Sequence, residues 1–389
     1  MKGKTQKQKI DELLNRGVEQ VLPSREGLAG LMGRKKIRLY LGIDPTAKKL
    51  HLGHVVNLRK LQKFAELGHQ AILVIGTGTV LAGDPSLREA ARPRISEKEI
   101  KENIKDWKNQ LKEVLDFSKV RIRYNGDWLL KLRYQDIIGI ASHISAGKLF
   151  QREMFQRRLK KGDTVWTHEA LYPLFQGYDT VALGVDLEIG GTDQIFNMLI
   201  GRELMQKMKR KEKFVLTTRM ILGTDGKPMS KTKGNCVWLT DSAQEMYGKI
   251  MSIPDRLILS YFELLTDVPI KEIRNLSFRQ SKAKLAREIT CIFHGKKAAD
   301  LAEKEFNRVF KEKKLPSKMP EAKVKERLLN ILDLLVKTKL TSSKAEAKRL
   351  VEQGGIGIDG EIQKDWRKKI EIKKGMVIRA GRRRFVKIQ

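Results

Sequence analysis

Residues 40–54 have the sequence Tyr-Leu-Gly-Ile-Asp-Pro-Thr-Ala-Lys-Lys-Leu-His-Leu-Gly-His. The apolar alternation over 37–43 predicts a strand that ends in the turn Asp44-Pro45-Thr46, and a helix is expected to begin at His51 and His54. Helix N-termini attract anions because their backbone N–H groups are unpaired and the helix dipole is positive there. Two histidines three residues apart share one face of the first turn and can donate to phosphate oxygens. The stretch therefore predicts a phosphate site.

A metal-binding pair or a surface cluster is the alternative for the two histidines. The phosphate site is favoured by the preceding turn and by Gly53, which leaves room for a flat ring to approach the backbone. A predicted helix over 52–67 and an apolar run over 71–75 follow the first strand. Strand, helix and strand in this order predict a parallel βαβ unit. We therefore expect an α/β fold with a Rossmann-like parallel sheet.

The stretch Tyr40-x-Gly42-x-Asp44-Pro45-Thr46, followed by His51-Leu52-Gly53-His54, resembles the HIGH signature of class I aminoacyl-tRNA synthetases, in the form found in the tyrosyl-tRNA synthetase family. The resemblance implies that ATP activates tyrosine to tyrosyl-adenylate and pyrophosphate, and that tyrosine then passes to the 3′ end of tRNA(Tyr). It also implies that Mg²⁺ arrives with ATP and that the protein itself holds no metal. Thr46, His51 and His54 would stabilise the reacting phosphate, and Gly42, Asp44 and Gly53 would bind ATP.

Composition agrees with a polyanionic partner. The 389 residues include 79 Lys+Arg and 46 Asp+Glu, a formal net charge of +33. Such an excess favours nucleic acid, although a uniformly basic proteome or a hot habitat would also raise it. No run of eighteen apolar residues is present, so we expect a cytoplasmic protein with no membrane partner. Cys236 and Cys291 stand alone, which indicates neither disulfides nor a zinc ribbon.

The loop 76–86 follows the second predicted strand and is rich in glycine. It lacks both the dinucleotide-binding and the P-loop pattern, so we expect a ligand-binding loop at the carboxyl edge of the sheet. Asp84 is either a turn former or, as the resemblance implies, the group that holds the ammonium of the amino acid. Arg88 and Arg92 belong either to a solvated face or to a flap that meets pyrophosphate, as the family implies.

Tyr172, Gln176 and Asp179 are spaced to lie on one face of a helix that Pro173 could begin. Their apolar neighbours suit a partly buried wall. The resemblance implies that Tyr172 and Gln176 bind the amino group and that Asp179 and Tyr40 contact the phenol. Buried groups that need this hydroxyl are left unpaired by phenylalanine, the usual explanation for selectivity in tyrosyl-tRNA synthetases.

A further strand is predicted over 181–189, followed by Gly190-Gly191-Thr192-Asp193-Gln194. Glycines let the backbone close on a ribose, a carboxylate can bind its hydroxyls, and an amide can donate to an oxyanion. A simple turn is the alternative. The resemblance assigns Gly191 and Asp193 to ATP and Gln194 to the carboxyl group during catalysis.

A strand over 214–222 leads into the loop 226–235, which resembles the KMSKS signature. Mobile lysines suit a reaction whose negative charge moves in the transition state. Lys231 and Thr232 occupy the matching catalytic positions. The first lysine of the signature is Pro228 here, and Lys227 is the alternative ATP-binding cation.

The resemblance implies a catalytic domain over 1–225 with an inserted dimerisation segment, a loop and helical anticodon-arm domain over 226–310, and an αL-type RNA-binding module over 336–389. The segment 311–335 between them is expected to be a linker. The last module carries 16 Lys and Arg against 6 Asp and Glu. A solvated basic face is the alternative to RNA binding. The expected phosphate-contacting residues are Lys344, Lys348, Arg349, Arg382, Arg383 and Arg384.

Two other functions stay open at this point. A tryptophanyl-tRNA synthetase of the same class would share the fold and the ATP signatures, but Tyr40 and Asp179 argue against indole. A non-catalytic RNA-binding protein would explain the basic tail, and Pro228 is its only other support. The expected assembly is a homodimer, by family analogy alone.

Overall fold

The computed structural model describes every residue except 1–4, 87–94, 231–233, 313–314, 316–318 and 382–383. The chain forms two compact units, Met1–Ala299 and Asp300–Gln389, and each is described by itself. No helix in the described part is long and apolar enough to cross a membrane.

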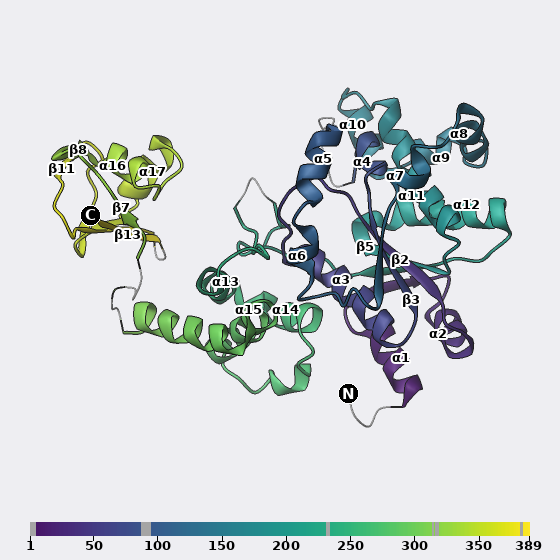
Figure 1. The fold of residues 1–389 in the computed structure, drawn as a ribbon, viewed down its shortest axis with the longest axis horizontal. Helices are drawn as coiled ribbons and strands as arrows, with labels where there is room; N and C mark the ends of the chain where they lie inside the picture. The colour runs from purple at the N-terminus through teal and green to yellow at the C-terminus, as the bar shows by residue number, and fades with distance from the viewer. Residues whose placement is uncertain (1–4, 87–94, 231–233, 313–314, 316–318, 382–383) are drawn as a thin grey trace. The chain divides into compact units, whose positions relative to one another are not determined.

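A six-stranded sheet organises the first unit (Figure 1). Its spatial order is β1-β6-β5-β2-β3-β4; β1 is antiparallel to β6 and all other neighbours are parallel. The strands are β1 (Val18–Leu22), β2 (Arg38–Ile43), β3 (Gln70–Ile75), β4 (Val120–Tyr124), β5 (Leu187–Gly191) and β6 (Phe214–Thr218). From β2 the chain moves through β3 towards β4, and from β5 it moves the opposite way to β6. The order therefore reverses between β2 and β5, where open α/β folds bind ligands.

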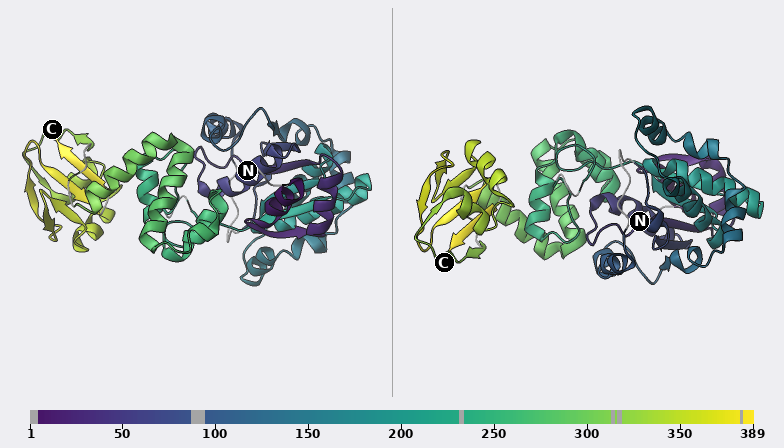
Figure 2. Two further views of the ribbon diagram at one scale, coloured as in Figure 1. Left: turned by 90° about the horizontal axis from the view of Figure 1, so that it is seen from below. Right: turned by 90° about the horizontal axis from the view of Figure 1, so that it is seen from above.

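Helices cover both faces of this sheet (Figures 1 and 2), which explains why β3, β5 and β6 are almost wholly buried. α3 (Leu52–Glu66) joins β2 to β3, as the sequence predicts. The other helices of the unit are α1 (Gln6–Asn15), α2 (Arg25–Arg34), α4 (Thr79–Ala82), α5 (Glu97–Ile104), α6 (Trp107–Leu111), α7 (Gly126–Leu129), α8 (Tyr134–Ala141), α9 (Ala146–Phe150), α10 (Glu153–Lys160), α11 (Thr167–Leu183), α12 (Ile195–Lys209), α13 (Ala243–Met251), α14 (Ile258–Leu265) and α15 (Phe278–Phe310), the last of which spans the unit boundary.

Four elements differ from what the sequence pattern indicates. The apolar residues of 10–22 have helical spacing, yet residues 18–22 form β1 at the edge of the sheet, because Gly17 takes a left-handed conformation (φ 67°) after α1. The strand predicted over 181–189 begins only at Leu187, since α11 continues to Leu183 and ends at Gly184 in the left-handed region. Pro173 lies inside α11 instead of beginning it. β4 also lies within the charged segment 96–160, whose sequence pattern is mostly helical.

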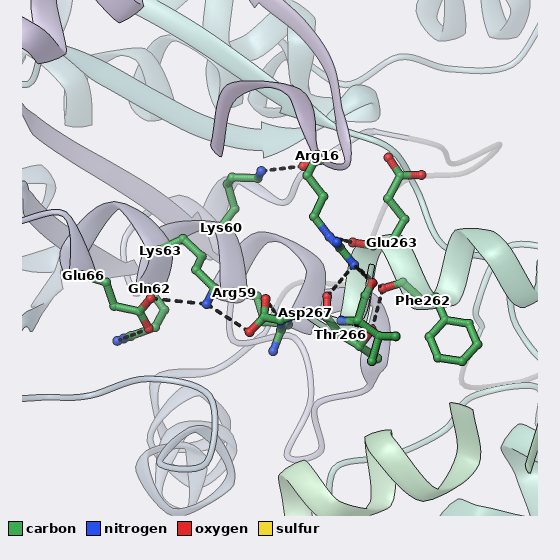
Figure 3. Close-up of polar contacts among 11 residues, drawn as sticks. Arg16, Arg59, Lys60, Gln62, Lys63, Glu66, Phe262, Glu263, Thr266 and Asp267 are labelled. Atoms are coloured by element: carbon green, nitrogen blue, oxygen red, sulfur yellow. Dashed lines mark hydrogen bonds and ion pairs between the residues drawn. The ribbon is translucent and has the colours of Figure 1, made fainter. Parts of the chain in front are cut away.

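Arg16 joins the beginning of the chain to the C-terminal end of α14 (Figure 3). Its guanidinium donates to the carbonyl oxygens of Glu263 (3.1 Å), Phe262 (3.0 Å), Thr266 (2.9 Å) and Val268 (2.8 Å). These include carbonyls that have no partner within the helix, and a cation is favoured at this end of the helix dipole. α3 approaches the same place, because Asp267 accepts from Arg59 and Lys63 at 2.8 and 3.1 Å.

Arg16→Met is expected to lower the free energy of unfolding by about 2 kcal/mol, because several charge-assisted hydrogen bonds are lost at once. Arg16→Lys should recover only part of the loss, since a single ammonium cannot span these carbonyls. Urea unfolding measures the effect, with the exposed Arg34→Met as control. An equal stability of the Arg16→Met and Arg34→Met proteins would contradict the assignment.

Asp186 ties β2 to the beginning of β5. Its carboxylate accepts from the N–H of Arg38 at 2.8 Å and from Lys35 and Lys211 at 2.9 and 3.0 Å. Burial alone would raise the pKa of this carboxyl, but the hydrogen bonds from Arg38, Lys35 and Lys211 outweigh burial and lower it below its ordinary value.

A carboxyl whose pKa is lowered by folding stabilises the protein above its unfolded pKa of about 4, and this stabilisation is lost as the pH falls through the folded pKa. Asp186→Asn is therefore expected to lower the free energy of unfolding by about 1 kcal/mol at pH 7, and the difference from wild type should vanish once the pH falls below the folded pKa. Urea unfolding across this range measures it. A difference that persists at low pH would show that packing, not charge, is responsible.

The second unit contains a sheet with the order β10-β9-β12-β13-β7 and a two-stranded β11-β8 pair. Asp359 and Gly360, both at positive φ, make the predicted hairpin turn between β9 and β10. The elements are β7 (Glu321–Ala322), β8 (Leu328–Asn330), α16 (Ile331–Lys337), α17 (Lys344–Glu352), β9 (Ile356–Ile358), β10 (Glu361–Gln363), β11 (Lys369–Glu371), β12 (Val377–Ala380) and β13 (Arg384–Ile388). β7 and β8 lie in the segment 311–335, which is therefore not a free linker: both pair with strands of the module and extend its sheets.

Candidate active site

A pocket of about 330 Å³ opens at the carboxyl ends of β2 and β5, where the strand order reverses. Its walls come from the turn after β2, the first turn of α3, the middle of α11 and the segment that follows β5. Pro228 and Met229 also line it, so the loop after β6 reaches the same place. The volume and position suit a small ligand with a polar group.

His51 and His54 organise the N-terminus of α3. The Nδ1 of His51 accepts from the N–H of Gly53 at 3.1 Å, and the N–H of His51 lies 3.2 Å from the Nδ1 of His54. The ring centroids are 4.1 Å apart. A neutral imidazole that accepts at Nδ1 carries its proton on Nε2. Both rings line the pocket as potential donors to an anion.

Asp179 is a buried carboxylate in the pocket wall. Its oxygens accept from Asn125 Nδ2 at 3.0 Å and Trp128 Nε1 at 2.8 Å. Burial raises the pKa of Asp179 well above its ordinary value, the two hydrogen bonds oppose this, and Glu188 adds to it. Two fixed donors orient the carboxylate, so its remaining lone pairs can accept from a ligand hydroxyl.

Tyr40 lies behind this wall. Its side chain is fully buried, and its hydroxyl lies 3.3 Å from the carbonyl oxygen of Gln176 and 3.2 Å from Thr180 Oγ1. Burial, followed by the charges of Glu188 and Asp179, raises the pKa of this phenol. Tyr40 is not among the described residues that line the pocket.

Asp44 fixes the side of the pocket next to β2. It accepts from Thr79 Oγ1 at 2.7 Å and from the Tyr172 hydroxyl at 3.1 Å. Gly76 permits this approach, because a Cβ there would lie only 1.9 Å from Asp44 Oδ1. Asp44, in the turn after β2, therefore fixes the position of the Tyr172 side chain on α11.

Gln194 forms hydrogen bonds with two carboxylates on one side of the pocket. Its Nε2 donates to Asp84 Oδ2 and to Asp193 Oδ2, both at 3.0 Å. Ser86 donates to the other oxygen of Asp84 through its N–H (2.9 Å) and its hydroxyl (2.6 Å). Burial raises the pKa of Asp193. The two carboxylates give this side of the pocket a negative potential that suits an ammonium group or hydroxyl donors.

The sequence pattern did not indicate several residues that hold the side chains of the pocket in place. Asn125 and Trp128 lie directly after β4, so their place at the carboxyl edge could have been inferred had that strand been predicted. Arg152 is 7% exposed, donates to Ser86 and lies 4.0 Å from Asp84. It is 68 positions from Asp84 in the chain, and no short-range pattern indicates this contact. Burial lowers the pKa of Arg152.

The structure brings most of the expected residues to this one pocket. Lys227 is exposed and does not line it, whereas its backbone N–H donates to Asp225 at 2.9 Å. Arg88, Arg92, Lys231 and Thr232 lie outside the described residues. The expected residues that line the pocket are Gly42, Asp44, Thr46, His51, Gly53, His54, Asp84, Tyr172, Gln176, Asp179, Gly191, Asp193 and Gln194.

The expected RNA-binding side chains that are described are exposed on the second unit. Lys348 lies over the Trp366 ring with its Nζ 4.3 Å from the centroid, and Lys344 pairs with Asp333 at 2.5 Å. Arg384 pairs with Glu346 at 3.0 Å. Arg349 is exposed, and Arg382 and Arg383 lie outside the described residues.

Comparisons with known proteins agree across almost the whole chain. Residues 32–311 match the family described as tRNA synthetases class I (W and Y), and residues 311–388 match the tyrosine–tRNA ligase SYY-like C-terminal domain. The chain is 42% identical over 387 residues to a tyrosine–tRNA ligase of Thermotoga maritima, covering 97% of this chain and 96% of that protein. It is 40% identical over 390 residues to a tyrosine–tRNA ligase of Moorella thermoacetica, covering 97% and 94%.

Solved structures show the same fold. A C-terminally truncated mitochondrial tyrosyl-tRNA synthetase of Aspergillus nidulans matches with a TM-score of 0.67 at 22% identity, over 78% of this chain and 94% of that one. The tyrosyl-tRNA synthetase of Archaeoglobus fulgidus, solved with L-tyrosine, matches with a TM-score of 0.61 at 22% identity, over 76% and 99%.

The parallel sheet, the paired histidines at a helix N-terminus and the pocket at the reversal point define a nucleotide-binding α/β enzyme of the class I synthetase type. The alignments with both relatives cover 97% of this chain. The chain belongs to the family of tRNA synthetases class I (W and Y).

Proposed function

We propose that this chain is a tyrosine–tRNA ligase, which activates tyrosine with ATP and transfers it to the 3′ end of tRNA(Tyr). The main support for this proposal is that one pocket contains both an acceptor for a phenol and donors for a phosphate. Asp179, oriented by Asn125 and Trp128, offers an acceptor for a phenol, while His51 and His54 offer donors at the N-terminus of α3. Relatives about 40% identical over 97% of the chain carry the same name.

In the first step a carboxylate oxygen of tyrosine attacks the α-phosphorus of ATP. A new P–O bond forms, the bond to the β-phosphate oxygen breaks, and pyrophosphate leaves. Negative charge grows on the phosphate oxygens, to which His51, His54 and Thr46 would donate from the wall of the pocket that they line. Mg²⁺ carried by ATP would neutralise part of the pyrophosphate charge. Catalysis is then positional and electrostatic, because no enzyme side chain forms a covalent bond.

The amino-acid side of the pocket supplies complementary groups. Asp84, Tyr172 and Gln176 surround the place of the ammonium, and Asp193 with Gly191 takes the ribose. Gln194 holds the carboxyl group. In the second step a hydroxyl of the terminal adenosine of tRNA attacks the activated carbonyl, and AMP leaves.

The second unit binds the phosphates of tRNA through exposed cations on and beside α17. Double replacement of Lys348 and Arg349 by alanine is expected to weaken tRNA binding and to reduce the slope of log affinity against log salt by about 1.4, because each lost phosphate contact in single-stranded regions removes about 0.7. Filter binding at several salt concentrations measures this. An unchanged slope would indicate a solvated basic face.

We also propose a cytoplasmic homodimer. Leu130, Tyr134 and Ile138 are 60, 81 and 49% exposed and occur close together in the chain around α7 and α8. Large exposed apolar side chains that cluster in this way are typical of an interface. Sedimentation equilibrium of the full chain tests the assembly.

ATP–pyrophosphate exchange with tyrosine, phenylalanine or tryptophan offered separately tests the activity. Exchange with tyrosine alone is the expected result. Exchange with tryptophan would instead support a tryptophanyl-tRNA synthetase, which the comparisons do not favour. No exchange with any of the three would favour a non-catalytic RNA-binding protein.

A further inference from the structure

Three amide side chains form a continuous hydrogen-bond chain in the wall of the pocket. Asn197 Nδ2, in the first turn of α12, lies 3.0 Å from Gln176 Oε1 and 2.9 Å from Gln194 Oε1. Gln176 and Gln194 line the pocket from different elements, α11 and the segment after β5. Asn197 thus joins two substrate-facing groups that are 18 positions apart in the chain.

The outer ends of this chain are carboxylates, which accept hydrogen bonds and cannot donate when ionised. Gln176 Nε2 donates to Glu188 Oε1 at 3.0 Å, and Gln194 Nε2 donates to Asp84 and Asp193. Both glutamines therefore turn their nitrogens towards carboxylates. Their carbonyl oxygens consequently point the other way, towards Asn197.

Glu188 is itself held in place. Its other oxygen accepts from Lys213 Nζ, and the two side chains are 2% and 0% exposed. Lys213 also donates to the carbonyl oxygen of Met198 at 3.0 Å. A buried ion pair with additional hydrogen bonds has little freedom to move, so Glu188 holds the Nε2 end of the Gln176 carboxamide in place.

Asn197 is the central residue of this chain, and it donates in both directions. Its single NH₂ group serves both carbonyl oxygens, and its own Oδ1 is buried without a hydrogen-bond partner among the described residues. The side chain is fully buried. An unpaired buried acceptor is unfavourable, because it loses its hydrogen bonds to water and gains none in the protein. Retaining it indicates that the position of the NH₂ group matters more than satisfying Oδ1.

We infer that Asn197 is a positioning residue for the amino acid: it holds the carbonyl oxygen of Gln176 where the ammonium group of the substrate donates to it. This inference rests on the proposed function. A carbonyl oxygen has two lone pairs, so Gln176 Oε1 can accept from Asn197 and from the ammonium together. Without Asn197 the carboxamide of Gln176 is held at its nitrogen alone and can rotate away from the substrate.

The test compares tyrosine with 3-(4-hydroxyphenyl)propionate, which has the phenol and the carboxylate but no ammonium. Asn197→Leu has a similar volume and no donor. We expect it to raise the Kd for tyrosine about tenfold or more, and the Kd for the analogue less than about twofold. Asn197→Ser keeps one donor and should fall between the two, and it carries the test if Asn197→Leu does not fold. Equilibrium dialysis on the full chain measures both ligands.

Asn109→Leu is the matched control, because Asn109 is exposed on α6 and donates to Asp106 away from the pocket. Equal weakening of both ligands in the Asn197 variants would overturn the inference and indicate a general packing role. Unchanged binding of both ligands would overturn it as well. If the unsubstituted protein fails to bind tyrosine, the proposed function fails instead, so the two failures are distinguishable.

Discussion

Replacing Asp179 by asparagine is expected to remove most of the preference for tyrosine over phenylalanine. We expect kcat/KM for tyrosine in ATP–pyrophosphate exchange to fall by about 10³-fold, which is most of the roughly 10⁴–10⁵-fold discrimination, on a logarithmic scale, of a site built to bond a hydroxyl; tyrosyl-tRNA synthetases are themselves the usual example of such a site. Asn125 and Trp128 already donate to the two carboxylate oxygens. An asparagine would turn its NH₂ group against one of these donors and leave fewer lone pairs for the phenol.

The rate with phenylalanine should change much less, because phenylalanine has no hydroxyl to lose. Asp127→Asn is a close control, because Asp127 lies between Asn125 and Trp128 in the chain but is exposed and does not line the pocket. If the Asp179→Asn protein loses activity with both amino acids by the same factor, Asp179 supports the pocket instead of reading the hydroxyl.

Asp179 should also make tyrosine binding depend on pH. Burial raises the pKa of its carboxyl, so the protonated form appears at a higher pH than for an ordinary aspartate. Protonation removes one acceptor, and we therefore expect the KM for tyrosine to rise as the pH falls through this pKa. The Asp179→Asn protein should lack that dependence.

Replacing His51 by asparagine is expected to slow tyrosyl-adenylate formation by about 10²–10³-fold, which is the usual effect of removing one donor to a developing negative charge. Asparagine is a good N-cap residue, so it can still accept from the N–H of Gly53 and preserve the beginning of α3. The substitution thereby separates the capping role of His51 from its role as a donor. Pre-steady-state measurement of adenylate formation is the direct readout.

The KM for tyrosine and the free energy of unfolding should change little in the His51→Asn protein. His51→Ala removes both the cap and the donor, and it should lose a further 1 kcal/mol or so of stability. A His51→Asn protein with an unchanged rate would show that the ring serves only to begin the helix. A rate loss matched by an equal loss of stability would lead to the same conclusion.

The sequence predicts those parts of the catalytic fold in which the spacing of apolar residues agrees with the residues that begin and end helices and strands. The apolar residues of β2 and β3, the turn at Asp44 and the histidines at the beginning of α3 are short-range features, and the structure confirms all of them. β1 and the beginning of β5 could not be predicted in the same way. β1 is a strand because it pairs with β6, whose residues are about 200 positions later, and that pairing outweighs the helical pattern of residues 10–22.

The histidines and the turn before them indicated a phosphate site from the sequence alone, because both features act through one turn of backbone and one helix N-terminus. The resemblance of this stretch to class I aminoacyl-tRNA synthetases then implied the reaction. It also determined most of the polar groups that line the pocket. How those groups are held became visible only in the folded chain: Asn125 and Trp128 bond Asp179, Arg152 lies beside Asp84, and Asn197 lies between two glutamines. These contacts join separate elements, and the direction of a buried hydrogen bond depends on which partner is brought opposite by the packing of the whole sheet.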